Sequence, residues 1–139
     1  MMPEDFQLDP RLAAESFPLG RLQLCEVRLF DDARFPWLIL VPAQAGLADI
    51  IDLDEAGRQR LMREVALAAA ALKTVTNCHK LNVAALGNQV RQLHVHVIAR
   101  FETDTAWPNP VWGFGARVPY EPPAEAKFTQ QMKAALSLR

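Results

Sequence analysis

The chain has 139 residues, half of them hydrophobic and 22% charged, which is typical of one globular domain that can bury a core. Its formal net charge is −1, and the basic residues form no run of the kind that marks a nucleic-acid groove. No apolar stretch approaches the roughly 18 residues of a membrane span. We therefore expect neither a nucleic acid nor a membrane among the partners of the protein.

The first residues are acidic and lack the apolar core of a secretory signal, so we expect a cytoplasmic protein. Cys25 and Cys78 lie far apart in the sequence. They could form a disulfide in an oxidising compartment, but without an export signal we expect two reduced thiols.

The first half of the chain predicts a short helix and a hairpin. The helix is predicted over residues 9–16, because Asp9 can cap it and Pro10 suits its first position. A proline and a glycine then end it. The next two apolar segments, 22–30 and 37–41, have the patterns of strands. The acidic turn between them predicts a hairpin.

The second half begins with a long helix, predicted over residues 55–75, where apolar side chains recur every three or four positions. Strands over 80–86 and 92–100 follow and predict a second hairpin. Segment 107–115 is rich in proline, glycine and tryptophan, which predicts irregular structure. A final helix is predicted over 122–138.

Short connections between the strands favour antiparallel pairing. We therefore predict a single α+β domain over residues 1–139, in which an antiparallel sheet packs one face against the long helix. The sequence contains no internal repeat and no composition change that would mark a domain boundary.

Two of the three histidines lie on the strand predicted at 92–100. Alternate side chains of a strand share a face, so Gln92, His94 and His96 are expected together on the more open face of the sheet. The apolar residues between them, Leu93, Val95 and Val97, are expected to face the long helix.

This pattern suits chemistry at phosphorus. A neutral imidazole is a nucleophile toward phosphorus, and a second imidazole can hold a phosphate oxygen or move a proton. The neutral amides of Asn82 and Gln89 lie just upstream and can donate hydrogen bonds to phosphate. The turn at Gly87 and Asn88 can bring backbone N–H groups close to an anion.

Two other interpretations apply to the histidines. They can be incidental residues of a partly exposed strand, or they can chelate zinc with a third ligand. Cys78 and His79 are the nearest candidates for that ligand, but their spacing does not support a site. We therefore expect no metal and no cofactor. The acidic pair Asp31 and Asp32 either serves the turn or binds a ribose hydroxyl.

Residues 87–100, Gly-Asn-Gln-Val-Arg-Gln-Leu-His-Val-His-Val-Ile-Ala-Arg, resemble the signature of the histidine triad (HIT) superfamily, in which three histidines alternate with hydrophobic residues. The resemblance includes Asn82 before the glycine, the strand that ends at Pro42, the long helix, and the pair Trp107-Pro108. It covers roughly residues 20–110.

The resemblance implies an α+β fold with an antiparallel sheet of about five strands, one long central helix and a C-terminal helix. It also implies a homodimer, for which the loop at 107–115 and the C-terminal helix are candidate contacts. The implied activity is hydrolysis or transfer of a nucleotide through a covalent nucleotidyl-histidine.

The resemblance also assigns roles by position. His94 takes the place of the nucleophile, and His96 that of its phosphate and proton partner. The implied substrate-binding residues are Asn82, Gln89, Gly87, Asn88, either Asp31 or Asp32 for the ribose, and Trp107.

Two residues depart from the family pattern. Gln92 replaces the first histidine of the triad, and its amide can form hydrogen bonds but cannot carry a proton at neutral pH. Trp37 stands where the common hydrolase branch often has a further histidine that supports the nucleophile.

Two functional hypotheses follow. The first is a hydrolase or nucleotidyl transferase acting at the α-phosphate of a nucleoside phosphoramidate, mixed anhydride or dinucleoside polyphosphate. The second is a nucleotide-binding protein or sensor with little or no turnover, which the replacements at Gln92 and Trp37 favour.

Overall fold

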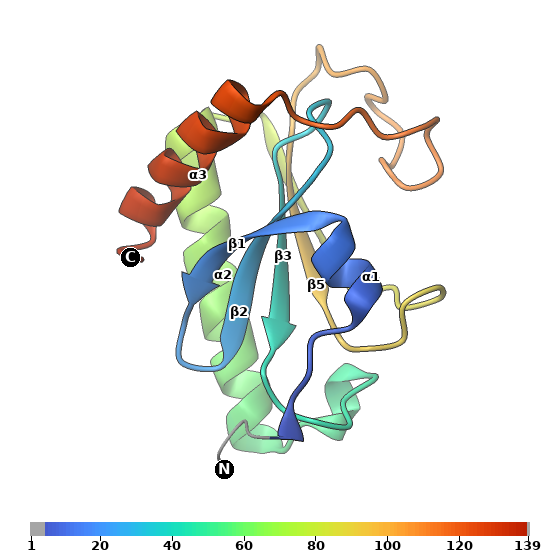
Figure 1. The fold of residues 1–139 in the computed structure, drawn as a ribbon, viewed down its shortest axis with the longest axis vertical. Coiled ribbons are helices and arrows are strands. Elements are labelled where there is room, and N and C mark those ends of the chain that lie inside the picture. Colours follow the sequence, from blue (N-terminus) through green and yellow to red (C-terminus); the bar gives the residue numbers. More distant parts are fainter. Residues whose placement is uncertain (1–4, 139) are drawn as a thin grey trace.

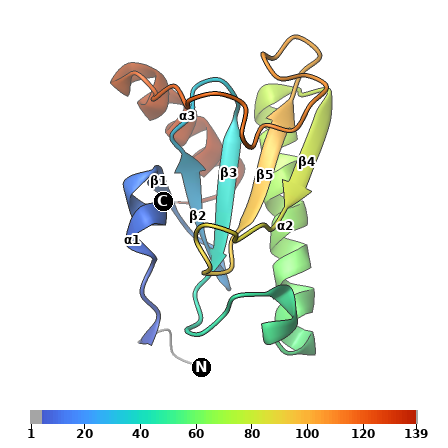
Figure 2. The same ribbon diagram turned by 90° about the vertical axis from the view of Figure 1, so that its right-hand side faces the viewer.

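The fold is an antiparallel sheet of five strands with helices on both faces, in a computed structural model that describes residues 5–138. The strands follow the spatial order β1-β2-β3-β5-β4 (Figure 2). Their bounds are β1 Ser16–Arg21, β2 Cys25–Phe30, β3 Trp37–Pro42, β4 Lys80–Ala84 and β5 Val95–Arg100. The helices are α1 Pro10–Ala14, the 3-10 turn η2 Ile50–Asp52, α2 Glu55–Thr76 and α3 Pro122–Ala135. The predicted α+β class is confirmed.

The first edge strand, β1, was not predicted. The expected helix over 9–16 is capped by Asp9 as predicted, but it ends at Ala14, and the next residues pair with β2. Pro18 and Gly20 indicated only the end of a helix. A proline is nevertheless tolerated on an edge strand, and the register shifts between these two residues, as at a bulge.

The two predicted hairpins are present, with shorter strands. β2 pairs antiparallel with β3, and β4 pairs antiparallel with β5. The strand expected over 92–100 begins at Val95, because residues 85–94 form a loop between β4 and β5. Gln92 and His94 therefore precede the strand on which they were predicted to lie.

Helix α2 packs against the sheet through the stripe that its periodicity predicted. Asp54 caps its first turn by accepting a hydrogen bond from the Gly57 N–H at 2.7 Å. The buried stripe also contains a charged residue, Glu64. Its carboxylate accepts hydrogen bonds from the backbone N–H groups of Leu24 and Cys25, both at 2.8 Å. The helix is thereby tied to the turn between β1 and β2.

Two hydrophobic clusters lie on opposite faces of the sheet. The first joins α2 to Leu93, Val95 and Val97, so these three residues face the helix as predicted. Both cysteines are unpaired and buried in this cluster. Figure 1 shows α2 and α3 on one side of the sheet and α1 on the other.

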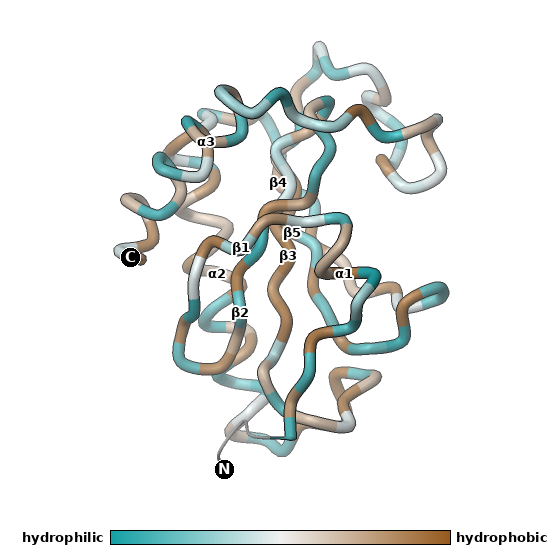
Figure 3. The backbone as a smooth tube through the Cα atoms, in the orientation of Figure 1, coloured by the Kyte–Doolittle hydropathy of each residue, from teal (hydrophilic) through white to brown (hydrophobic). Residues whose placement is uncertain are grey.

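The second cluster covers the face that was expected to be more open. It includes Leu12 of α1, Trp37 and Ile39 of β3, and Val111 of the segment after β5. The predominantly hydrophobic course of β3 is visible in Figure 3. His94 and His96 are consequently only 6% and 7% exposed. The prediction of an open face was wrong, because α1 and the segment 101–117 cross over it.

The segment after β5 is irregular, as predicted, and a buried ion pair organises it. The Arg100 guanidinium binds both carboxylate oxygens of Asp104, at 2.9 and 3.1 Å. The same carboxylate accepts hydrogen bonds from the backbone N–H groups of Phe101, Ala106 and Trp107. Among the described residues, no helix has the length and apolar character required to cross a membrane.

Candidate functional site

The sheet register places His96 at the centre of the face opposite α2. His96 lies directly across from Ile39 on β3, which lies across from Arg28 on β2. The adjacent row contains Trp37, opposite Ile98. An imidazole and an indole from neighbouring strands thus come together, although they are far apart in the sequence.

Trp37 determines the tautomer of His96. The Trp37 Nε1–H group donates a hydrogen bond to His96 Nδ1 at 2.9 Å. An indole nitrogen can only donate, so Nδ1 must be the acceptor and the ring proton must lie on Nε2. Burial, together with the neighbouring His94, lowers the pKa of His96 to about 3. At neutral pH, His96 is therefore an uncharged donor.

His94 has the opposite tautomer. Its Nδ1 lies 2.6 Å from the backbone carbonyl oxygen of Gln92, and a carbonyl can only accept. The ring proton therefore lies on Nδ1, and Nε2 keeps a free electron pair. The ring centroids of His94 and His96 are 4.8 Å apart. The pair thus presents a nucleophilic nitrogen beside a hydrogen-bond donor.

The Gln92 side chain binds the N-terminal segment of the chain. Its Oε1 accepts a hydrogen bond from the Asp9 N–H, and its Nε2 donates to the Gln7 carbonyl, both at 2.9 Å. Beside it, Arg11 Nη1 donates to the Gln89 carbonyl at 2.9 Å. Gln92 was predicted to lie with the two histidines on one strand face. Instead, both ends of its amide clamp residues 7–9 onto the loop that carries His94.

This clamp predicts a measurable role for Gln92. Gln92→Glu keeps an acceptor for the Asp9 N–H but places an oxygen against the Gln7 carbonyl. We expect faster hydrogen exchange at Asp9 and Arg11, and a free energy of unfolding lower by about 0.5–1.5 kcal/mol. The control is Arg91→Gln on the same loop, which should change neither quantity. Unchanged exchange in Gln92→Glu would contradict the clamp.

A cavity of about 360 Å³ lies over the two histidines. Its apolar lining comes from α1, β2, β3, the loop before His94 and the segment after β5: Leu12, Phe30, Trp37, Ile39, Val90 and Trp112. Three residues predicted to bind phosphate or substrate, Gly87, Asn88 and Gln89, also line it. The cavity combines an apolar wall with a polar loop, which suits a ligand that has an apolar ring and an anionic group.

A second cavity of about 320 Å³ also reaches His94. It lies between the η2 turn and the end of β4, and its lining is mostly aliphatic, from residues such as Ile50, Ile51 and Leu86. Asp49 is the one acidic side chain among the described residues that line it. His94 therefore stands between two cavities, with Gly87 shared by both.

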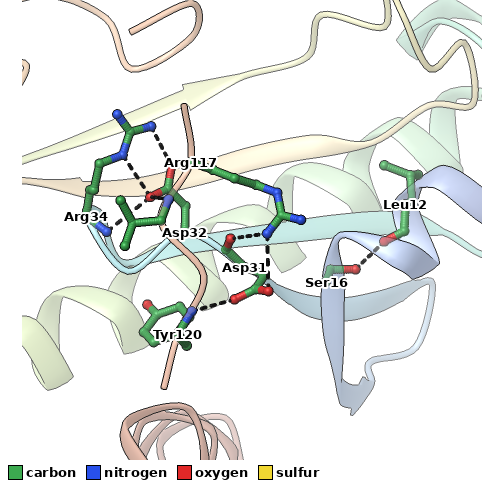
Figure 4. Close-up of polar contacts among 8 residues, drawn as sticks. Leu12, Ser16, Asp31, Asp32, Arg34, Arg117 and Tyr120 are labelled. Carbon is green, nitrogen blue, oxygen red and sulfur yellow. Dashed lines mark hydrogen bonds and ion pairs between the residues drawn. The ribbon is translucent and has the colours of Figure 1, made fainter. Parts of the chain in front are cut away.

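Of the two acidic residues in the turn, only one lines the first cavity. Figure 4 shows the polar contacts of both. Asp32 lines the cavity, is almost completely buried, and binds the Arg34 guanidinium at 3.0 and 2.8 Å. Asp31 does not line it and instead accepts hydrogen bonds from Arg117 and the Tyr120 N–H. Of the two residues proposed for the ribose, only Asp32 faces the cavity, and its carboxylate is already paired.

Two further predicted substrate residues, besides Asp31, lie outside both cavities. Asn82 shares the face of His96, but its Oδ1 accepts a hydrogen bond from Arg100 Nη1 at 2.9 Å. The Trp107 ring packs against His79, with a centroid separation of 5.2 Å, and against the Arg100 guanidinium. Both residues support the turn after β5.

Sequence reasoning missed several residues of the first cavity, among them two arginines and a tryptophan. Arg34 and Arg117 line it beside Asp32, and Trp112 packs edge-on against His96 with a centroid separation of 5.4 Å. The turn sequence Asp-Asp-Ala-Arg contained a signal for Arg34. Trp112 belongs to the aromatic segment 107–115, which carried no sign of which tryptophan faces the histidines. Within residues 5–138, no group of three or more His, Cys, Asp or Glu could hold a metal ion.

The lowered pKa of His96 predicts how stability changes with pH. Below about pH 6.5 the unfolded chain binds a proton at His96, whereas the folded chain does not until the pH approaches 3. The free energy of unfolding should therefore fall as the pH is lowered through this window, by at most about 1.4 kcal/mol per pH unit. Urea denaturation at several pH values measures this slope. His96→Asn should make it shallower, and an unchanged slope would contradict the assignment.

Comparisons with known proteins agree on one family. The model of the HIT domain matches residues 11–103. A solved histidine triad protein from Sinorhizobium meliloti is 45% identical, with a TM-score of 0.94, over 96% of this chain and 99% of that one. Histidine triad proteins from Bradyrhizobium japonicum and Marinobacter aquaeolei are each 42% identical, with TM-scores of 0.92. These two alignments cover 94% and 95% of this chain, and 98% and 96% of the others. No curated protein matches the chain.

Proposed function

Because the chain belongs to the HIT domain family, we propose that it is a nucleotide-binding hydrolase or nucleotidyl transferase. It acts at the α-phosphate of a nucleoside phosphoramidate or a dinucleoside polyphosphate. One observation carries this proposal: the His94 and His96 rings, with centroids 4.8 Å apart, both line the first cavity, and the contacts at their Nδ1 atoms make Nε2 an acceptor in His94 and a donor in His96. Both cysteines are unpaired, which suits a cytoplasmic protein.

The proposed reaction has two steps. His94 Nε2 attacks the α-phosphorus, forming a covalent nucleotidyl-histidine as the leaving group departs. The backbone carbonyl of Gln92 stabilises the positively charged His94 ring that forms, because it accepts the hydrogen bond from Nδ1–H throughout the reaction. His96 Nε2–H and the backbone of the Gly87–Gln89 turn stabilise the phosphoryl oxygens. Water, or an acceptor alcohol in a transfer, then releases the nucleotide.

The nucleoside is proposed to occupy the first cavity. Phe30 and Trp112 provide aromatic surface for a base, and Asp32 with Arg34 lies where ribose hydroxyls can form hydrogen bonds. The second cavity, on the other side of His94, is then available to the leaving group.

The second candidate function is a nucleotide sensor without turnover. The observation that favours it is the Gln92 clamp, since the first position of the triad is occupied by an amide with both ends bound to the N-terminal segment. Such a protein would bind the nucleotide through the first cavity and leave its phosphate bonds intact.

One experiment separates the two functions. The protein is incubated with adenosine 5′-phosphoramidate and with diadenosine polyphosphates, and release of AMP is compared between wild type and His94→Ala. Turnover by wild type alone is expected. Turnover that survives in His94→Ala would overturn the covalent mechanism. AMP binding in calorimetry without any turnover would select the sensor.

We also propose that the protein is a homodimer. The edge strand β4 and its surroundings expose apolar side chains, with Val83 and Leu86 each more than two-fifths exposed, and Phe114 of the 107–115 loop is partly exposed. Surfaces of this kind are typical of subunit contacts. Sedimentation equilibrium should give twice the chain mass, and a monomer mass at every concentration would contradict the proposal.

A further inference from the structure

The proton in the hydrogen bond between Trp37 and His96 belongs to the indole and cannot be transferred in an acid–base step. Both side chains are buried, and their bond of 2.9 Å joins a nitrogen that only donates to a nitrogen that only accepts. A histidine in place of Trp37 would offer a second titratable ring. The indole offers the same hydrogen bond but never gains or loses a proton near neutral pH.

Among residues 5–138, no acidic or basic side chain is hydrogen-bonded to the His94 or His96 ring. The charged side chains around the first cavity are Glu15, Asp32, Arg34 and Arg117, with Arg28 in the same sheet row as His96. Asp32 binds Arg34, Arg117 binds Asp31, and the Arg28 guanidinium binds Ser16, while Glu15 is exposed. Near His94, the Asp9 carboxylate binds Arg11, and the Asp49 side chain lines the second cavity. Within residues 5–138, neither ring forms an ion pair.

From this geometry we propose that Trp37 is a positioning residue that holds His96 as a permanent donor, and that the site therefore expels leaving groups as stable anions without protonating them. The proposal rests on the proposed function and narrows its substrates. It favours phosphoanhydrides and mixed anhydrides, whose leaving groups are phosphates or carboxylates, over phosphoramidates, whose amines require a proton.

The electron count of the first step explains this preference. The His94 Nε2 electron pair forms the P–N bond, and the pair of the breaking P–O bond departs with the leaving oxygen. The proton on His94 Nδ1 stays on that nitrogen, which donates a hydrogen bond to the backbone carbonyl of Gln92. His96 donates a hydrogen bond from Nε2 without transferring the proton, because its loss would leave an imidazolate anion in a buried site. The step is complete without any proton transfer when the leaving group is a weak base.

The leaving-group half of the proposal is tested with two aryl esters of AMP that differ only in the acidity of the phenol. Wild type should cleave the p-nitrophenyl ester at least about 100-fold faster than the phenyl ester, because general acid catalysis typically contributes about 10²–10⁴-fold where it operates. Trp37→His, which introduces a titratable ring, should reduce this ratio by about tenfold or more and make it depend on pH. Trp37→Phe should lower kcat for both esters and leave the ratio large.

The positioning half is tested by ¹⁵N NMR of the ring nitrogens, in a His79→Gln background that removes the signals of the third histidine. His79 lies outside both cavities, so this background should keep full activity. His96 should show the Nε2–H tautomer without titration between about pH 5 and 9, whereas Trp37→Phe should show a mixture of tautomers.

Three results would overturn the inference or its premise. An Nδ1–H tautomer of His96 in wild type would refute the positioning role. Similar rates for the two esters in wild type would refute the leaving-group preference. Absence of turnover of both esters would refute the proposed function, while the NMR spectrum would still decide whether Trp37 holds His96.

Discussion

His94→Gly is expected to lower the rate of diadenosine polyphosphate cleavage by at least about 10³-fold, because the variant lacks the nucleophile of the first step. The same variant should still hydrolyse adenosine 5′-phosphorimidazolide, in which an imidazole is already bonded to phosphorus. That compound stands in for the covalent intermediate, so its hydrolysis needs only water, His96 and the first cavity. Release of AMP from both substrates measures the two steps separately.

The matched control for this prediction is His79→Gly, which removes an imidazole far from the cavities and should retain wild-type rates on the polyphosphate. Thermal melting of each variant confirms that the fold is kept. If His94→Gly cleaved the polyphosphate at the wild-type rate, the assignment of His94 as the nucleophile would be contradicted. Loss of activity on both substrates with the fold intact would contradict the separate second step.

Arg100→Met is expected to lower the free energy of unfolding by about 3–5 kcal/mol, because it leaves a buried carboxylate without its cation. Arg100 is 1% exposed, and the Asp104 side chain that it binds is 5% exposed. The guanidinium also donates to Asn82 and to the Asn109 carbonyl. Urea denaturation measures the change, provided that the slope of the transition is the same in both proteins.

Arg117→Met provides the comparison, because it removes the cation of an exposed pair. The Arg117 side chain is 38% exposed in its ion pair with Asp31, so its replacement should cost less than about 1 kcal/mol. If both variants lost the same free energy of unfolding, the buried ion pair would contribute no more to stability than the exposed one.

Much of the fold follows from local patterns in the sequence. The periodicity of α2 predicts a helix because one of its faces is buried. The apolar run of β3 and the alternation of β5 predict strands, although both strands are buried on their two faces. β1 was missed since its proline and glycine are also the residues that end helices, and only pairing with β2 makes them part of a strand. Strand pairing is a tertiary interaction, which local patterns do not contain.

The candidate site was predictable where it depends on the motif and not where it depends on distant contacts. His94 and His96 were identified from their spacing in the sequence. Their tautomers could not be predicted, because they follow from contacts with Trp37 and with the Gln92 backbone carbonyl. The bond from Trp37 to His96 spans 59 positions in the sequence, and that from Asp9 to Gln92 spans 83. Asp31 and Asp32 are adjacent, and the sequence does not show which of them faces the cavity. Their side chains are oriented by contacts with Arg34 and with the segment after β5.

The docked N-terminal segment links ligand exchange to a small part of the chain. Leu12 of α1 forms part of the cavity wall, and it is the one buried residue of that short helix. The segment is also held by the two hydrogen bonds of Gln92, by the one from Arg11 to Gln89, and by the packing of Phe6 and Leu8 against the second cluster. Fraying of this segment would remove the part of the cavity wall that Leu12 provides. We therefore expect fraying of the first helix to shorten the residence time of a ligand in the first cavity.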